Sequence, residues 1–281
     1  MRKGLLAACF VLLTGCSQIE KLTIAGMTPQ KFLEGMPYIT LTIGKSSFIL
    51  IQPSSTLMVY GLGILTTILG ILFLRNHRGQ ASRKWWGIGM VLWGIGAIVA
   101  GSSYQAFGYE LKCATRSLCL STSWAEILYL WITIFSMNAL LVAMTYRMHK
   151  KTQRKNIRFY ALISCMLYSA WLLTGILTSN SFMISYEALL LFLLPTIVLY
   201  FVVLLHQKSA VDRTMKLTWI LFLGVNVAYF MWMFAGIAAP LYQNLGFWLN
   251  ENDILHLFLI LWMVWQYRKV YPLLADEPLE P

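Results

Sequence analysis

Charged residues are scarce in this chain of 281 residues. Asp, Glu, Lys and Arg together make up 12% of it, whereas apolar residues make up 58%. Soluble globular domains carry about 25% charged residues, so the scarcity argues against a soluble domain and points to lipid as the solvent. Negatively charged residues are the scarcer kind, with 11 Asp and Glu residues against 22 Lys and Arg residues. The chain has room for several apolar helices of about 20 residues, the length that crosses a bilayer.

The formal net charge of +11 is placed mostly in short connections between apolar runs. The basic groups lie at 75–84, 147–158, 208–216 and 268–269. They occupy alternate connections, which is the positive-inside pattern of cytoplasmic loops. A nucleic-acid surface would need these charges on one folded face, which separated short loops do not provide. We therefore expect the lipid bilayer, and no nucleic acid, as the partner of these charges.

The N-terminus resembles a bacterial lipoprotein signal. Basic residues at positions 2 and 3 precede an apolar stretch from Gly4 to Leu13. A short apolar run that ends in small residues is typical of a secretory signal. The run ends in Leu13-Thr14-Gly15-Cys16, similar to the lipobox in which the cysteine is lipidated and becomes the first residue. The prediction is a signal at 1–16 with lipidation of Cys16; an ordinary signal with an incidental Cys16 is the alternative.

Residues 17–55 are only moderately apolar and are expected to lie outside the membrane. Within them the stretches 38–43 and 47–51 flank Gly44 and Lys45. Alternation and β-branched residues on both sides of a Gly turn predict a small β-hairpin. Because an isolated hairpin is marginally stable, it should rest on the membrane domain.

Seven apolar stretches are long enough to cross the hydrocarbon of a bilayer. They cover residues 56–74, 85–105, 124–146, 157–178, 183–205, 217–240 and 252–271. An outside N-terminus and seven crossings put every basic connection and the tail at 272–281 on the cytoplasmic side. The predicted fold is all-α, a seven-transmembrane-helix bundle at 56–271 that makes the chain a multi-pass protein of the bacterial plasma membrane.

Two cysteines, Cys113 and Cys119, share the connection after the second expected helix. The topology places this connection outside, where oxidising conditions permit a disulfide. A metal pair is the alternative, but the connection contains no His to complete it. A disulfide between Cys113 and Cys119 is therefore the prediction.

Ionisable residues gather near the exterior ends of the expected helices. They are Glu110, Glu126, Glu187, Asp253 and His256. Ionisable groups at membrane depth are energetically costly and are functional candidates for that reason. Asp253 and His256 are three residues apart and share a helix face. The other three histidines lie in cytoplasmic connections, so only His256 can meet the acids. Glu126, Glu187 and Asp253 lie at N-terminal helix ends and also suit the helix dipole, so a purely structural role for them as caps and anchors stays open.

The layout as a whole resembles a family of membrane hydrolases. Seven spans, serines that close the helix expected at 85–105, an acid soon after, and a His on 252–271 are similar to the superfamily of alkaline ceramidases and adiponectin-type receptors. Members of that superfamily hold zinc with histidines and hydrolyse lipid amides, assisted by a Ser and an Asp. The resemblance covers the membrane domain in layout, and it implies a divergent ceramidase-like lipid amide hydrolase.

Several residues can be matched to the superfamily pattern. Ser102 or Ser103 matches the Ser, and Glu110 stands in for the Asp. His256 matches the second His of the helix-seven pair, whereas Asn252 occupies the first His position and the helix at 85–105 has no His. Catalytic zinc needs three protein ligands and an open water position. Zinc would thus have an incomplete ligand set, and the cofactor is left open with no metal ligand assigned.

Two classes of function follow from these residues. One is the lipid amide hydrolase, with His256 as base or metal ligand. Its candidate catalytic residues are His256, Asp253, Glu126 and Glu110. The other is a non-catalytic membrane sensor or an assembly partner for envelope proteins, in which the polar cluster only fixes helix packing. A transporter or channel is less favoured, because only Asn138 and Asn226 lie deep within the spans.

Overall fold

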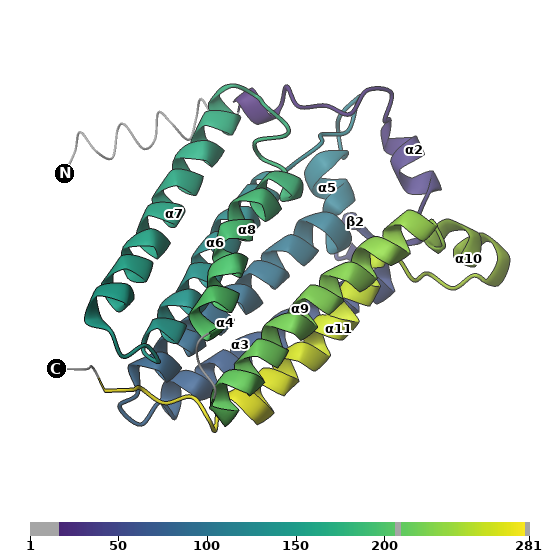
Figure 1. Cartoon of the computed structure of the whole chain (residues 1–281). Coiled ribbons are helices and arrows are strands. Elements are labelled where there is room, and N and C mark those ends of the chain that lie inside the picture. Colours follow the sequence, from purple (N-terminus) through teal and green to yellow (C-terminus); the bar gives the residue numbers. More distant parts are fainter. Residues whose placement is uncertain (1–16, 206–208, 279–281) are drawn as a thin grey trace.

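The computed structural model describes residues 17–205 and 209–278 as a bundle of long helices with a small sheet at one end (Figure 1). The predicted signal at 1–16 and the lipidation candidate Cys16 lie outside the described residues. The long helices are α3 (Pro53–Arg75), α4 (Ala81–Gly101), α6 (Trp124–Thr145), α7 (Lys151–Leu177), α8 (Tyr186–Leu205), α9 (Ala210–Ala235) and α11 (Glu251–Trp265). The shorter elements are α2 (Pro29–Glu34), β1 (Tyr38–Ile43), β2 (Ser46–Ile51), α5 (Gly108–Lys112) and α10 (Ala238–Leu245), and the π-helical segments η1 (Ser102–Ala106) and η2 (Gln266–Val270) extend α4 and α11.

Six of these helices are long and apolar enough to cross a bilayer: α3, α4 with η1, α6, α7, α8 and α9. The chain is therefore a multi-pass, mainly helical membrane protein, as the composition predicts. The seventh expected span is divided in the structure. Helix α11 has 15 residues, and η2 continues it with Arg268 and Lys269. Because α11 alone is shorter than the roughly 20 residues that span hydrocarbon, a seventh crossing stays a prediction.

The β-hairpin predicted around Gly44 and Lys45 is present. Strands β1 and β2 pair antiparallel, with Tyr38 opposite Ile51 and Ile43 opposite Ser46. Gly44 has a φ of 62°, a left-handed conformation that glycine adopts without strain. The side chain of Ile51 is fully buried, so the hairpin rests on the helices beneath it. We call this part of the molecule the hairpin end: it contains β1, β2, α2, α5 and the first turns of α6, α8 and α11 (Figure 1).

Close backbone approach holds α3 against α4. A Cβ atom added at Gly94 would lie 2.6 Å from the carbonyl oxygen of Gly63, and one added at Gly70 would lie 2.9 Å from that of Gly87. Neither distance leaves room for a side chain. Small residues at such crossings let two helices pack tightly in lipid, where no hydrophobic effect drives them together.

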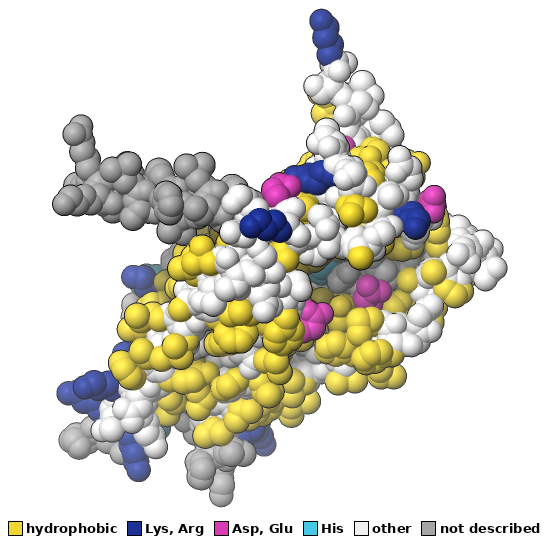
Figure 2. All heavy atoms as spheres, turned by 90° about the horizontal axis from the view of Figure 1, so that it is seen from above, with side chains coloured by type: hydrophobic (Ala, Val, Ile, Leu, Met, Phe, Trp, Pro, Cys, Tyr) yellow, Lys and Arg dark blue, Asp and Glu magenta, His cyan; other side chains and the backbone are white. Residues whose placement is uncertain are grey.

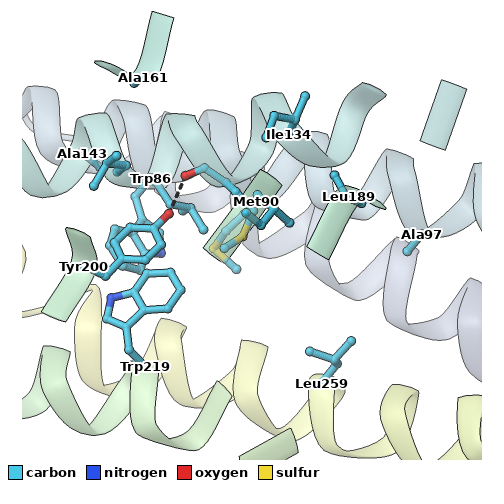
Figure 3. Packing of buried hydrophobic residues seen from close by; sticks show 14 of the residues in the cluster. Trp86, Met90, Ala97, Ile134, Ala143, Ala161, Leu189, Tyr200, Trp219 and Leu259 are labelled. Carbon is cyan, nitrogen blue, oxygen red and sulfur yellow. Dashed lines mark hydrogen bonds between the residues drawn. The ribbon is translucent and has the colours of Figure 1, made fainter. Parts of the chain in front are cut away.

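Aromatic rings of α4, α8 and α9 pack against one another among the buried hydrophobic residues drawn in Figure 3. Tyr200 of α8 stacks on Trp219 of α9 with ring centroids 3.7 Å apart, and its hydroxyl donates to the carbonyl oxygen of Met137 in α6. Trp86 of α4 donates from Nε1 to Oε1 of Gln266 at 2.9 Å. These bonds satisfy the Tyr200 hydroxyl and the Trp86 Nε1, whereas the buried Nε1 of Trp219 has no hydrogen-bond partner among the described residues.

The opposite end, which we call the basic end, is closed by the C-terminal segment. The Asp276 carboxylate accepts from the backbone N–H groups of Ala81 and Ser82 at 2.8 Å each, and so caps the first turn of α4. Arg147 lies between Asp212 at 3.3 Å and Glu277 at 3.1 Å. These contacts join α4, α6 and α9 through the tail.

Candidate binding site

A pocket of about 600 Å³ opens at the hairpin end and is lined by two of the predicted site residues, Glu126 and His256. Figure 2 shows the surface hollowed at this end, with acidic side chains beside the hollow. Residues of η1, α6, α8, α9 and α11 contribute to the lining. We call this space the outer chamber.

Glu126 is held at the chamber wall by its position at the start of α6. Ser123 caps that helix, since its hydroxyl accepts from the Glu126 N–H at 3.3 Å. The Glu126 carboxylate accepts from Lys112 Nζ at 2.8 Å and from Ser103 Oγ at 2.9 Å. Only 2% of Glu126 is exposed, so its charge is balanced by a buried ion pair rather than by water. The Glu126 carboxylate is thus bound by Lys112 and Ser103.

Lys112 is a residue that sequence reasoning missed. The chain places it directly before Cys113, and Cys113 and Cys119 form a disulfide with an S–S distance of 2.12 Å, the pairing expected from their shared connection. The carbonyl oxygen of Lys112 also accepts from the Leu120 N–H at 2.9 Å. The crosslinked loop therefore fixes the backbone from which Lys112 reaches Glu126.

The same loop is tied to the N-terminal segment. Ile24 donates to the carbonyl oxygen of Cys119 at 2.8 Å, and Cys119 donates to that of Met27 at 2.9 Å. Arg116 pairs with Glu20 at 2.8 Å. Hydrogen bonding from Arg116 lowers the pKa of the Glu20 carboxyl below its usual value, so this pair favours the charged form of Glu20.

His256 lies at the inner limit of the outer chamber. Its side chain is 8% exposed, and its Nδ1 atom has no hydrogen-bond partner among the described residues. Buried polar atoms are usually paired, so this buried ring nitrogen is an exception within the wall of the chamber. Asn252, one helical turn earlier, lines the same chamber.

The structure places the other two candidate residues outside the chamber lining. The Asp253 side chain accepts from the backbone N–H of Asn250 at 2.9 Å, and Asn250 accepts from that of Asp253 at 2.9 Å, so the two form a capping box at the start of α11. Glu110 accepts from the Ile49 N–H at 2.8 Å and ties α5 to β2. In this structure the Asp253 carboxylate caps α11 and the Glu110 carboxylate links α5 to β2.

A second, apolar cavity of about 310 Å³ adjoins the outer chamber, and we call it the inner chamber. The residues that line both chambers are Ala100, Tyr129, Tyr186, Leu255 and His256. Farther in, the lining consists mainly of Leu, Val, Ile, Phe and Trp side chains from α3, α4, α8, α9 and α11. Its deep asparagine, Asn226, donates to the carbonyl oxygen of Phe222 at 2.8 Å. The two chambers together form one site with a polar and an apolar part.

The chambers do not fit a zinc centre of the ceramidase type. Across residues 17–205 and 209–278, no three His, Cys, Asp or Glu side chains lie close enough together to hold a metal ion. The carboxylates are separated by role, since Glu126 pairs with Lys112 while Asp253 caps its helix. The site therefore has the polarity of a binding pocket without the ligand set that catalytic zinc requires.

Comparison with known proteins assigns no family. No protein-family model matches the chain, and no curated protein and no solved structure is detectably similar to it.

Proposed function

We propose that this chain binds a lipid-like amphiphile, with the polar head in the outer chamber and the hydrocarbon chain in the inner chamber. The observation that carries the proposal is the junction of a polar and an apolar cavity at Tyr129, Tyr186 and His256. The volumes, about 600 and 310 Å³, lie in the range of roughly 300–1,000 Å³ that holds small molecules. Membrane lipids combine a polar head group with a hydrocarbon chain, so the bilayer contains ligands that match the two chambers.

In this proposal the hairpin end faces the exterior of a bacterial plasma membrane and the basic end faces the cytoplasm. The alternation of basic connections supports that orientation. The disulfide between Cys113 and Cys119 supports it independently, because disulfides persist in oxidising compartments. The amphiphile would then come from the outer leaflet.

Hydrolysis of a lipid amide is the chemistry we propose for the site, and the place of His256 in the lining of both chambers is the observation that favours it. The junction of the two chambers is where the bond between a head group and an acyl chain would lie. A neutral imidazole there can take a proton from water as a general base, provided that the water lies within about 3 Å. The water oxygen would attack the amide carbonyl carbon, the C–N bond would break, and the imidazolium of His256 would return the proton to the leaving amine. Glu126 would hold Lys112 in place at the chamber wall.

The non-catalytic alternative uses the same site. A sensor or assembly partner would bind the amphiphile, and the buried polar groups would only fix the packing of α6 and α11. The distinction is whether the bound molecule is cleaved, so binding and turnover must be measured separately.

Binding can be tested with a photoactivatable N-acyl amide in lipid nanodiscs. Ala100→Phe places a ring where the chambers meet and should lower labelling at least about tenfold, since it removes the space for the chain. The matched control is Ile95→Phe on the same helix, because Ile95 is 41% exposed on the lipid-facing surface and lines neither chamber. Equal labelling of both variants and the unmodified protein would overturn the binding proposal.

Turnover can be tested by mass spectrometry of fatty acid released from a panel of N-acyl lipids. His256→Gln should abolish release while labelling by the photoactivatable probe persists. The control is His149→Gln at the basic end. Labelling without any release by the unmodified protein would refute the hydrolase and leave the sensor or partner role.

A further inference from the structure

Four tyrosines from four different elements face the outer chamber. They are Tyr104 of η1, Tyr129 of α6, Tyr186 of α8 and Tyr229 of α9. Tyr104 and Tyr129 meet edge to face, with ring centroids 6.2 Å apart and an interplanar angle of 89°. Tyrosines near helix ends commonly anchor a protein at the membrane interface. These four instead line the outer chamber, so their rings form part of the wall that a ligand would meet.

The charged groups of the chamber wall are acidic. Glu126 and Glu187 line the chamber, and no Lys or Arg is among the described residues that do so. Glu126 is already paired with Lys112 at 2.8 Å. Glu187 is exposed to the chamber, forms no ion pair within the described part of the chain, and lies within electrostatic reach of Tyr104 and Tyr229. The Glu187 carboxylate is therefore the acidic group of the chamber wall that can pair with a positively charged ligand.

Lys112 shows how a carboxylate and a tyrosine ring can hold a cation in this protein. The ammonium group of Lys112 donates a hydrogen bond to the Glu126 carboxylate, and it lies 5.3 Å from the centroid of the Tyr104 ring. A carboxylate and a tyrosine face thus already hold one ammonium group behind the chamber. Aromatic faces attract cations through the ring quadrupole, and cages of such rings recognise quaternary ammonium ligands.

His256 adds a third feature at the floor of the chamber. It is 8% exposed, and its Nδ1 has no partner in the described residues. The residue lines both chambers, so its ring adds a polar group at the floor of the outer chamber.

We propose that the outer chamber selects a positively charged head group, an amine or a quaternary ammonium, by the four tyrosine faces and the Glu187 carboxylate. This inference rests on the amphiphile binding proposed above. It names the class of ligand as a cationic or zwitterionic lipid-like molecule with its positive nitrogen in the outer chamber. An anionic head would meet Glu187 with no Lys or Arg in the lining to compensate.

The test is competition against the photoactivatable N-acyl amide by three molecules with the same twelve-carbon chain: dodecylamine, dodecyltrimethylammonium and dodecanoate. Both cations should compete at least tenfold better than dodecanoate. Glu187→Gln should reduce that preference about tenfold, consistent with a loss of one close charge and its contact. Glu34→Gln, an exposed carboxylate of α2 outside the chamber, is the matched control.

A second pair of variants keeps the test independent of Glu187. Tyr229→Phe retains a ring face and should preserve the preference for dodecyltrimethylammonium, whereas Tyr229→Leu should weaken it several-fold. Equal competition by all three molecules, or preference for dodecanoate, would overturn the inference while leaving amphiphile binding intact. Absence of any labelling would instead refute the proposed function.

Discussion

Substitution of Lys112 by Met is the sharpest test of how the site is built. The Lys112–Glu126 pair is 2.8 Å long, and its side chains are only 11% and 3% exposed. Removal of one partner from a buried ion pair costs about 3–5 kcal/mol, because the remaining charge is left without compensation. Ser103 still donates to Glu126 at 2.9 Å in the variant, so we expect a loss near the lower limit, about 3 kcal/mol.

The double variant Lys112→Met, Glu126→Met removes both charges, so it distinguishes the effect of an unpaired buried charge from an effect on helix packing. Replacing both charges by apolar groups is often nearly neutral, so the double variant should recover most of the loss. Ser103 and Ser123 would still bond each other at 2.6 Å. The measurement is the free energy of unfolding from reversible denaturant titration in mixed micelles.

Lys45→Met is the matched control for this experiment, since Lys45 is exposed in the hairpin turn at the same end of the molecule. It should unfold within about 0.5 kcal/mol of the unmodified protein. If Lys112→Met behaved like Lys45→Met, or if the double variant were no more stable than the single one, the buried pair would not exist as described.

Three further predictions concern the topology and the exterior chemistry. Reporter fusions after residues 80, 152 and 212 should report the cytoplasm and one near 115 the exterior; a cytoplasmic signal at 115 would reverse the orientation. Cys113 and Cys119 should resist thiol alkylation until a reductant is added, and free labelling of both in intact protein would contradict the disulfide. The mass of the mature N-terminus should show an acylated Cys16, whereas an intact Met1 would refute the lipoprotein signal.

Local features of the fold were predictable because their causes are local. The hairpin follows from a Gly turn between two β-branched runs, and the six bilayer-length helices follow from continuous apolar stretches. The seventh stretch was harder to delimit from hydropathy. Its apolar length suggests 252–271, but α11 ends at Trp265 and the π-helical η2 carries Arg268 and Lys269 onward.

The composition of the site was less predictable because it depends on contacts between distant elements. Lys112 meets Glu126 from a loop that the disulfide crosslinks, and nothing in the spacing of the two residues indicates the pair. The convergence of Tyr186 and Tyr229 is equally hidden, since tyrosines near helix ends suggest an interface belt. The capping role of Asp253 did have a signal, namely Asn250 three residues before an acid at a helix start.

The position of photolabel adducts within the bundle tests the central claim most directly. An N-acyl amide carrying a diazirine midway along its chain should mark residues that line the inner chamber, such as Leu190, Leu193 and Phe230, once the labelled protein is digested and sequenced by mass spectrometry. Adducts confined to side chains on the lipid-facing surface, such as Ile64 and Leu162, would show that the chain lies outside the bundle and would contradict the account.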